Sequence, residues 1–78
     1  MLVALENQSM AGSKRKYNRI KIVLLENEKT NIWLAEKLGV STTAVSKWCT
    51  NRNQPTVETL FRISEALNIS VCELLVSK

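Results

Sequence analysis

The chain has 78 residues, which allows a single domain with one small core. Apolar residues make up 45% of the chain, and basic residues outnumber acidic ones by 11 to 7, so the net charge is +4. Histidine and aspartate are absent. Because general acid–base catalysis most often uses histidine, and nucleophilic serines need a base beside them, we expect a protein without catalytic activity or a cofactor.

Metal binding and membrane insertion have no support in the sequence. Cys49 and Cys72 lack CxxC spacing and histidine partners, so we interpret both as small apolar core residues and not as zinc ligands. No segment approaches the ~20 apolar residues that cross a bilayer, and residues 1–12 lack the features of a secretory signal. We therefore expect a cytoplasmic protein. One proline, two glycines and the absence of alternating β-branched runs favour an all-α fold.

Residues 1–16 are predicted to form an N-terminal arm that precedes a domain over residues 17–78. The arm ends in a basic cluster, Lys14, Arg15 and Lys16. Two interpretations of this cluster stay open. It is either part of a disordered, solvated tail or a segment that contacts the phosphate backbone of DNA.

Helices are expected at both ends of the domain. The first spans about residues 17–27. A fourth helix begins at the N-cap Thr56 and ends at Asn68, a residue that tolerates the left-handed conformation. Ser70 and Glu73 have the spacing of a capping box, which predicts a fifth helix. The core side chains expected from these three helices are Ile20, Val23, Leu24, Leu60, Ile63, Leu67, Leu74 and Leu75.

Residues 30–48 predict two short helices joined by a tight turn. Thr30 would cap the first of them, Gly39 would end it in the left-handed conformation, and Ser41 would cap the second. Val45 and Trp48, three residues apart, would form the buried face of the second helix. Two helices at a steep angle across a short glycine-containing turn form a helix-turn-helix unit, whose second helix lies in the DNA major groove.

The outer face of that second helix, about residues 42–49, carries short hydroxyl groups and one cation. No acidic residue occurs between Glu36 and Glu58, which favours the approach of a polyanion. Hydroxyl groups can hydrogen-bond several bases, and a lysine can bind the acceptors of guanine. The predicted base contacts are Thr42, Thr43, Ser46 and Lys47.

The run AEKLGVSTTAVSKW over residues 35–48, followed by Pro55, resembles the DNA-binding domain of the lambda-type phage repressors and Cro proteins, which recurs in XRE-type bacterial regulators. The resemblance extends over about residues 19–76. It implies a compact five-helix domain that regulates transcription as a homodimer on a roughly palindromic site in double-stranded DNA. It also implies phosphate contacts at Asn31, Ser41, Thr50, Asn51 and Arg52.

The sequence departs from this family at several structural positions. Leu24 and Cys49 replace an arginine and a glutamate that often pair in the interior, so we predict that both are buried and in contact. Asn51 replaces the usual glycine after the third helix and tolerates positive φ better than most residues. Glu28 and Lys29 replace a Gly-Leu pair, which leaves the end of the first helix open.

Four apolar residues lie outside the predicted core. Ile22 and Leu25 point away from the buried face of the first helix, and Ile32 and Trp33 lie off that of the second. We expect Trp33 to be more exposed than Trp48 and the four residues to contact the N-terminal arm or a protein partner, such as a second copy of the chain. The alternative function is therefore a protein-interaction or antitoxin-like module with the same fold.

Overall fold

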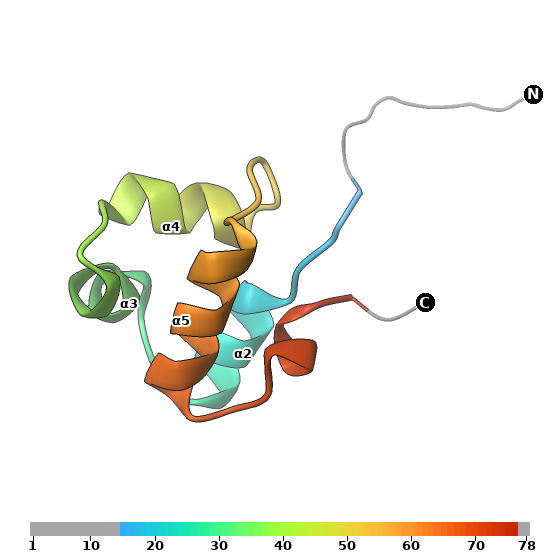
Figure 1. Ribbon diagram of the computed structural model, residues 1–78. Helices are drawn as coiled ribbons and strands as arrows, with labels where there is room; N and C mark the ends of the chain where they lie inside the picture. The colour runs from blue at the N-terminus through green and yellow to red at the C-terminus, as the bar shows by residue number, and fades with distance from the viewer. Residues whose placement is uncertain (1–14, 77–78) are drawn as a thin grey trace, which may run out of the picture.

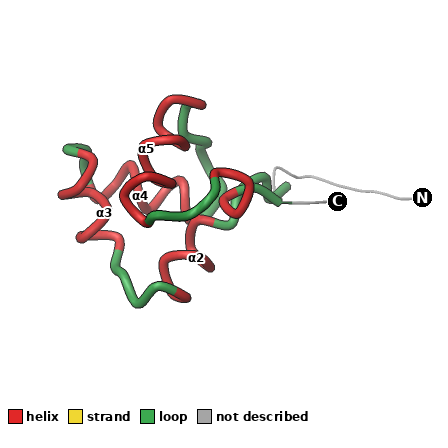
Figure 2. Tube along the Cα trace, turned by 60° about the horizontal axis from the view of Figure 1, so that its bottom comes forward, coloured by secondary structure: helices red, strands yellow, loops and turns green. Residues whose placement is uncertain are grey.

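The computed structural model describes residues 15–76, which fold as helices and connecting loops (Figures 1 and 2). Helix α4 lies across one end of the domain and contacts α2, while η1 packs beside α2 and α5 (Figure 1). No helix within the described range is long and apolar enough to cross a membrane. The all-α prediction is confirmed over residues 15–76 by four α-helices and one 3₁₀ helix, which are α2 (Ile20–Glu26), α3 (Asn31–Leu38), α4 (Thr42–Cys49), α5 (Val57–Leu67) and η1 (Val71–Leu74).

The core forms where the helices meet, and every element contributes to it. One side chain from each element has no exposed surface: Ile20, Leu34, Val45, Ile63 and Leu74. Burying a side chain of this size stabilises a fold by roughly 1.5–3 kcal/mol. The apolar faces that the sequence predicts for these elements therefore meet in one cluster.

Capping residues set the ends of the helices as the sequence predicts. Thr30, Ser41 and Thr56 each accept a hydrogen bond from the backbone N–H three residues later, at 3.0 to 3.1 Å. Each such cap contributes about 1 kcal/mol. Gly39 and Asn68 end α3 and α5 in the left-handed conformation, at φ values of 71° and 58°. Local sequence thus fixes three of the four α-helices at one or both ends.

The first helix begins later than predicted, at Ile20. The residues before it pair instead with the other end of the domain. The N–H of Arg19 donates to the carbonyl of Leu74 at 2.8 Å, and the N–H of Val76 donates to the carbonyl of Tyr17 at 2.9 Å. A backbone paired across the domain in this way is not available to a helix. We call this pairing of residues 17–19 with residues 74–76 the terminal junction.

The predicted fifth helix is a single 3₁₀ turn, η1, because the chain must enter the terminal junction directly after it. Ser70 accepts from the N–H of Cys72 at 3.2 Å, so the predicted capping box with Glu73 does not form. Leu74 is buried as predicted, but Leu75 is 42% exposed, which corrects its assignment to the core. Cys72 is also exposed, so its interpretation as a core residue was wrong.

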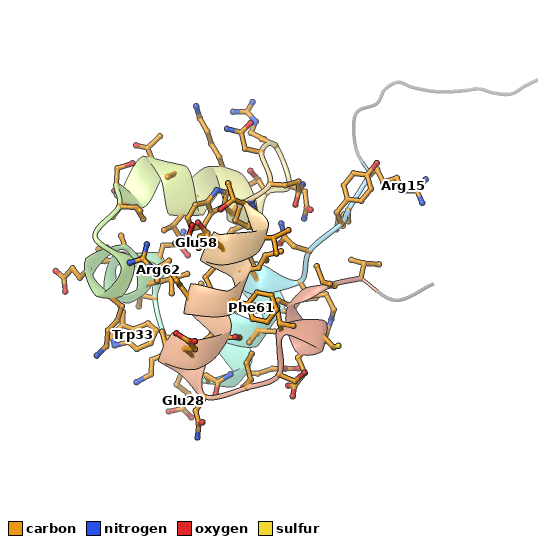
Figure 3. All side chains as sticks on the ribbon, viewed as in Figure 1. Arg15, Glu28, Trp33, Glu58, Phe61 and Arg62 are labelled. Atoms are coloured by element: carbon orange, nitrogen blue, oxygen red, sulfur yellow. The ribbon has the colours of Figure 1, made fainter. Side chains whose placement is uncertain are left out.

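The end of α2 shows how the chain replaces the usual glycine. Glu28 adopts a φ of 59°, in the left-handed region, and the N–H of Lys29 donates to the carbonyl of Leu24 at 2.8 Å. The chain therefore turns toward α3 through a residue for which this conformation costs roughly 1–2 kcal/mol. Arg62 supports the far end of α3, where its guanidinium donates to the carbonyl of Leu38 at 2.8 Å (Figure 3).

Candidate nucleic-acid interface

The corner between α3 and α4 turns within three residues. The N–H groups of Gly39 and Val40 both donate to the carbonyl of Ala35, at 2.9 and 3.0 Å. No atom lies within 4 Å of the point where a Cβ on Gly39 would stand, so glycine is favoured here by its φ and not by space. Ser41 then caps α4. This tight turn places α4 on the surface of the domain, across the end of the bundle (Figure 1).

Helix α4 has one buried face and one exposed face. Val45 and Trp48 are buried, as predicted. Within residues 15–76, the four side chains of the other face make no hydrogen bond to the rest of the protein, and all four are exposed. They are therefore free to bind an external partner. These residues are the predicted base contacts, Thr42, Thr43, Ser46 and Lys47.

A hollow runs along this exposed face, and its lining contains hydroxyl, amide and cationic groups but no acid. We call it the α4 hollow. Its residues come from the start of α3, from α4 and from the loop after α4. They include all four predicted base contacts and three of the five predicted phosphate contacts. The lining residues are Asn31, Thr42, Thr43, Ser46, Lys47, Thr50 and Arg52.

Besides Asn51, three of the predicted phosphate contacts also have roles inside the protein. The Ser41 hydroxyl accepts from the N–H of Ala44 as the cap of α4, outside the lining of the hollow. The Thr50 hydroxyl donates to the carbonyl of Ser46 at 3.1 Å. The Oδ1 of Asn31 lies 3.5 Å from the Cys49 sulfur, so its amide nitrogen remains available to a ligand. Arg52 makes no salt bridge among the described residues.

Asn51 holds the terminal junction in place and does not line the α4 hollow. Its Oδ1 accepts from the N–H groups of Tyr17 and Asn18 at 2.9 and 3.1 Å, and its amide nitrogen donates to the carbonyl of Asn18. Its φ is 60°, consistent with its place at a position where glycine is usual. These bonds occupy the Oδ1 and one of the two N–H groups of the amide, so a phosphate contact by the Asn51 side chain would have to use the second N–H.

Asn18 is the partner that sequence reasoning missed. It is only 4% exposed, and its amide nitrogen donates to the carbonyl of Trp48 at 3.0 Å and to Oε1 of Gln54 at 2.7 Å. Its Oδ1 accepts from the N–H of Ile20 at 3.0 Å. A buried asparagine with all these partners links the start of α2 to the end of α4. No local pattern around residue 18 signals such long-range bonds.

The basic cluster of the N-terminal arm lies partly within the described residues. Lys14 lies outside them, so its predicted contact stays a prediction. The Arg15 guanidinium lies 5.4 Å from the centre of the Tyr17 ring, at the end of the molecule away from Trp33 (Figure 3). Lys16 lines a second hollow, beside the start of α2.

The two residues that replace the ion pair usual in the family agree only partly with the prediction. Leu24 is 1% exposed, as expected, but Cys49 is half-buried. Burial raises the pKa of the Cys49 thiol, although the nearby Lys21 ammonium works in the opposite direction. The thiol is therefore protonated at neutral pH and can donate to Oδ1 of Asn31.

The four apolar residues predicted to lie outside the core divide into two kinds. Ile22, Leu25 and Ile32 are exposed, as predicted. Trp33 is half-buried against the core, more exposed than Trp48, and the ammonium groups of Lys29 and Lys37 lie 4.8 and 5.9 Å from the centre of its ring. The two lysines therefore cover part of the ring, and of these four residues the three aliphatic ones are the more exposed.

Comparison with known proteins identifies the group to which the domain belongs. A cryptic phage CTXphi transcriptional repressor, RstR, from Vibrio cholerae is 39% identical over 46 residues, which are 59% of this chain and 41% of the repressor. The crystal structure of a "putative DNA-binding protein" from Bacteroides fragilis matches with a TM-score of 0.75 and 44% identity, over 76% of this chain and 95% of the other. The helix-turn-helix family model matches residues 20–74. These residues are most of the chain, which therefore belongs to the helix-turn-helix family, as its resemblance to the lambda-type repressors and Cro proteins implies.

Proposed function

We propose that the chain is a sequence-specific, double-stranded DNA-binding regulator of transcription, with α4 in the major groove. The α4 hollow carries the proposal: hydroxyl groups, one amide and two cations line it, with no acid among them. Its side chains suit base edges, which present donors, acceptors and the thymine methyl group in the major groove. The relative named as a transcriptional repressor supports regulation as the outcome of binding.

The proposed contacts divide into base readout and phosphate binding. Thr42, Thr43, Ser46 and Lys47 would contact base edges, because they stand on the exposed face of α4. The remaining lining residues lie around the C-terminal end of α4 and would contact the phosphates that border the groove. Those residues are Asn31, Thr50 and Arg52.

We also infer that the chain binds its operator as a homodimer. A two-fold pair would place two α4 helices about 34 Å apart, one turn of DNA, and would read a roughly palindromic site. A single α4 contacts few base pairs, so a second copy would increase both affinity and specificity.

The experiment is selection of bound sequences from random duplex DNA, followed by titration of the selected and random duplexes over a series of salt concentrations. We expect an enriched palindrome, tighter binding to it than to random DNA, and a log Kd that rises linearly with log salt. Each phosphate contact contributes about 0.9 to this slope. Binding that shows neither enrichment nor salt dependence would contradict the proposed function.

A second candidate function is protein interaction through the exposed side chains of Ile22, Leu25 and Ile32. Exposed large apolar side chains can mark a protein contact, and two of these three, Ile22 and Leu25, lie three residues apart on α2. The variant with Ile22→Ser and Leu25→Ser separates the two functions. If protein interaction is the primary function, this variant loses its partner, and no selected DNA emerges even for the wild-type chain.

A further inference from the structure

The second hollow lies beside the start of α2 and carries more positive charge than the α4 hollow. Three cations line it, Lys16, Arg19 and Lys21, and no acidic residue does. Arg19 is engaged within the protein, since its guanidinium donates to the carbonyl of Glu73 at 3.1 Å and lies 4.0 Å from the Glu26 carboxylate. The two lysines are exposed and make no salt bridge to any residue within 15–76, so their ammonium groups are available to an external anion.

The two hollows adjoin each other along one side of the domain. Thr50 lines both of them. Cys49 lines the second hollow, and its thiol reaches Asn31, which lines the first. Lys21 lies close enough to Cys49 to influence its pKa. A polyanion that occupies the α4 hollow would therefore pass over Thr50 and reach the lysines of the second hollow.

We propose that Lys16 and Lys21 bind backbone phosphates of the DNA strand that borders the α4 contacts. This inference rests on the proposed function and extends its contact surface from α4 to the start of α2. Lys16 belongs to the basic cluster already considered as a phosphate contact, whereas nothing in the sequence singles out Lys21, because it lies on a helix whose role is otherwise to fill the core.

Phosphate is the ligand class that this hollow favours. A lysine ammonium is a compact charge on a flexible stem, which binds phosphate without the fixed geometry that base recognition needs. The hollow offers no exposed aromatic ring on which a base could stack, because its other lining residues are aliphatic or small and polar. Such contacts add affinity and orientation but do not distinguish one sequence from another.

The test measures the salt dependence of DNA binding for the full chain with Lys21→Ala, Lys16→Ala and Lys21→Arg. The control is Lys37→Ala, which removes a lysine from α3 beside Trp33, outside both hollows. Each alanine variant in the second hollow should reduce the slope of log Kd against log salt by about 0.9, equally for the selected and the random duplex. Lys21→Arg should keep the wild-type slope, and so should the control.

The possible results separate this inference from the function on which it rests. A steep slope for the wild-type chain that Lys21→Ala and Lys16→Ala leave unchanged would overturn the inference and leave the proposed function standing. A loss of affinity confined to the selected duplex would also overturn the inference, because the lysines would then contact bases. A wild-type chain that binds no duplex in a salt-dependent manner would overturn both.

Discussion

The corner between α3 and α4 and the terminal junction are built in opposite ways. In the turn of the corner, the backbone hydrogen bonds join residues four and five positions apart, from Gly39 and Val40 to Ala35. In the junction, the side chain of Asn18 reaches Trp48 and Gln54, which lie 30 and 36 positions away. The corner leaves the outer side chains of α4 free, whereas the junction occupies its polar side chains internally. Binding and stability should therefore depend on different residues, although the corner lies at the start of α4 and the terminal junction contacts its end.

The largest effect is expected from a charge placed in the core, at Leu24 of α2. Leu24→Arg places a charge at a site that is 1% exposed, and an unpaired buried charge costs roughly 3–5 kcal/mol, enough to unfold much of a small domain. Adding Cys49→Glu should recover part of this loss, and only part, because Cys49 is half-buried. Circular dichroism during thermal unfolding, with an osmolyte present to stabilise the fold, measures all three variants. The pairing idea fails if the double variant is no more stable than the sum of the single changes predicts.

The terminal junction supplies the next effect. Asn18→Ala leaves the carbonyl of Trp48 and the N–H of Ile20 without their side-chain partner, which should cost about 2–3 kcal/mol. Asn53→Ala is the matched control, because Asn53 is exposed and should stay within about 0.5 kcal/mol of the wild type. Urea denaturation gives the free energy of unfolding of each. If the two variants are equally stable, the junction contributes little and the contrast with the corner disappears.

The two regions also differ in how far sequence alone predicts them. Thr30, Gly39 and Ser41 act within a few residues of their own positions, so short-range rules place α3 and α4 correctly. The seven side chains of the α4 hollow were all predicted contacts. Helical period separates the outer face of α4, with its four predicted base contacts, from the inner face. The other three, Asn31, Thr50 and Arg52, were implied by the resemblance to the repressor family.

The missed features depend on pairings that no local rule contains. Asn18 looks like an ordinary polar residue before a helix until the chain folds Trp48 and Gln54 against it. The same pairing shortens α2 and exposes Leu75. Asn51 was assigned to phosphate from the resemblance, whereas its position in the fold directs its amide to the terminal junction.

Substitutions in the α4 hollow should have the opposite effect to those in the terminal junction: they should weaken DNA binding and leave stability unchanged. Thr43→Ala and Lys47→Ala should each weaken binding to the selected site by roughly 1–3 kcal/mol if they contact bases, without a change in the midpoint of thermal unfolding. Arg52→Ala should weaken binding to all duplexes about equally and flatten the salt slope. Fluorescence anisotropy with the selected and random duplexes distinguishes these cases. Wild-type binding by all three variants would mean that the exposed face of α4 is not the DNA surface.

The smallest effect concerns two residues in the left-handed conformation, one in the turn before α3 and one directly after α3. Glu28 has a φ of 59° and Gly39 a φ of 71°. Glu28→Gly relieves roughly 1–2 kcal/mol of backbone strain but adds the greater unfolded-state entropy of glycine, about 0.5–1 kcal/mol. We therefore expect a net stabilisation of about 0.5–1 kcal/mol and a rise of a few degrees in the thermal midpoint.

Gly39→Ala is the counterpart and should destabilise by about 1 kcal/mol. Because no atom lies within 4 Å of the new Cβ, this cost comes from the backbone alone, and the corner keeps its shape. Both variants should therefore bind the selected duplex like the wild type at temperatures where they are folded. A Gly39→Ala variant that is stable but binds poorly would show that the corner transmits strain to α4. The corner between α3 and α4 would then affect DNA binding through its backbone conformation, although it is the region in which binding and stability are expected to be most clearly separate.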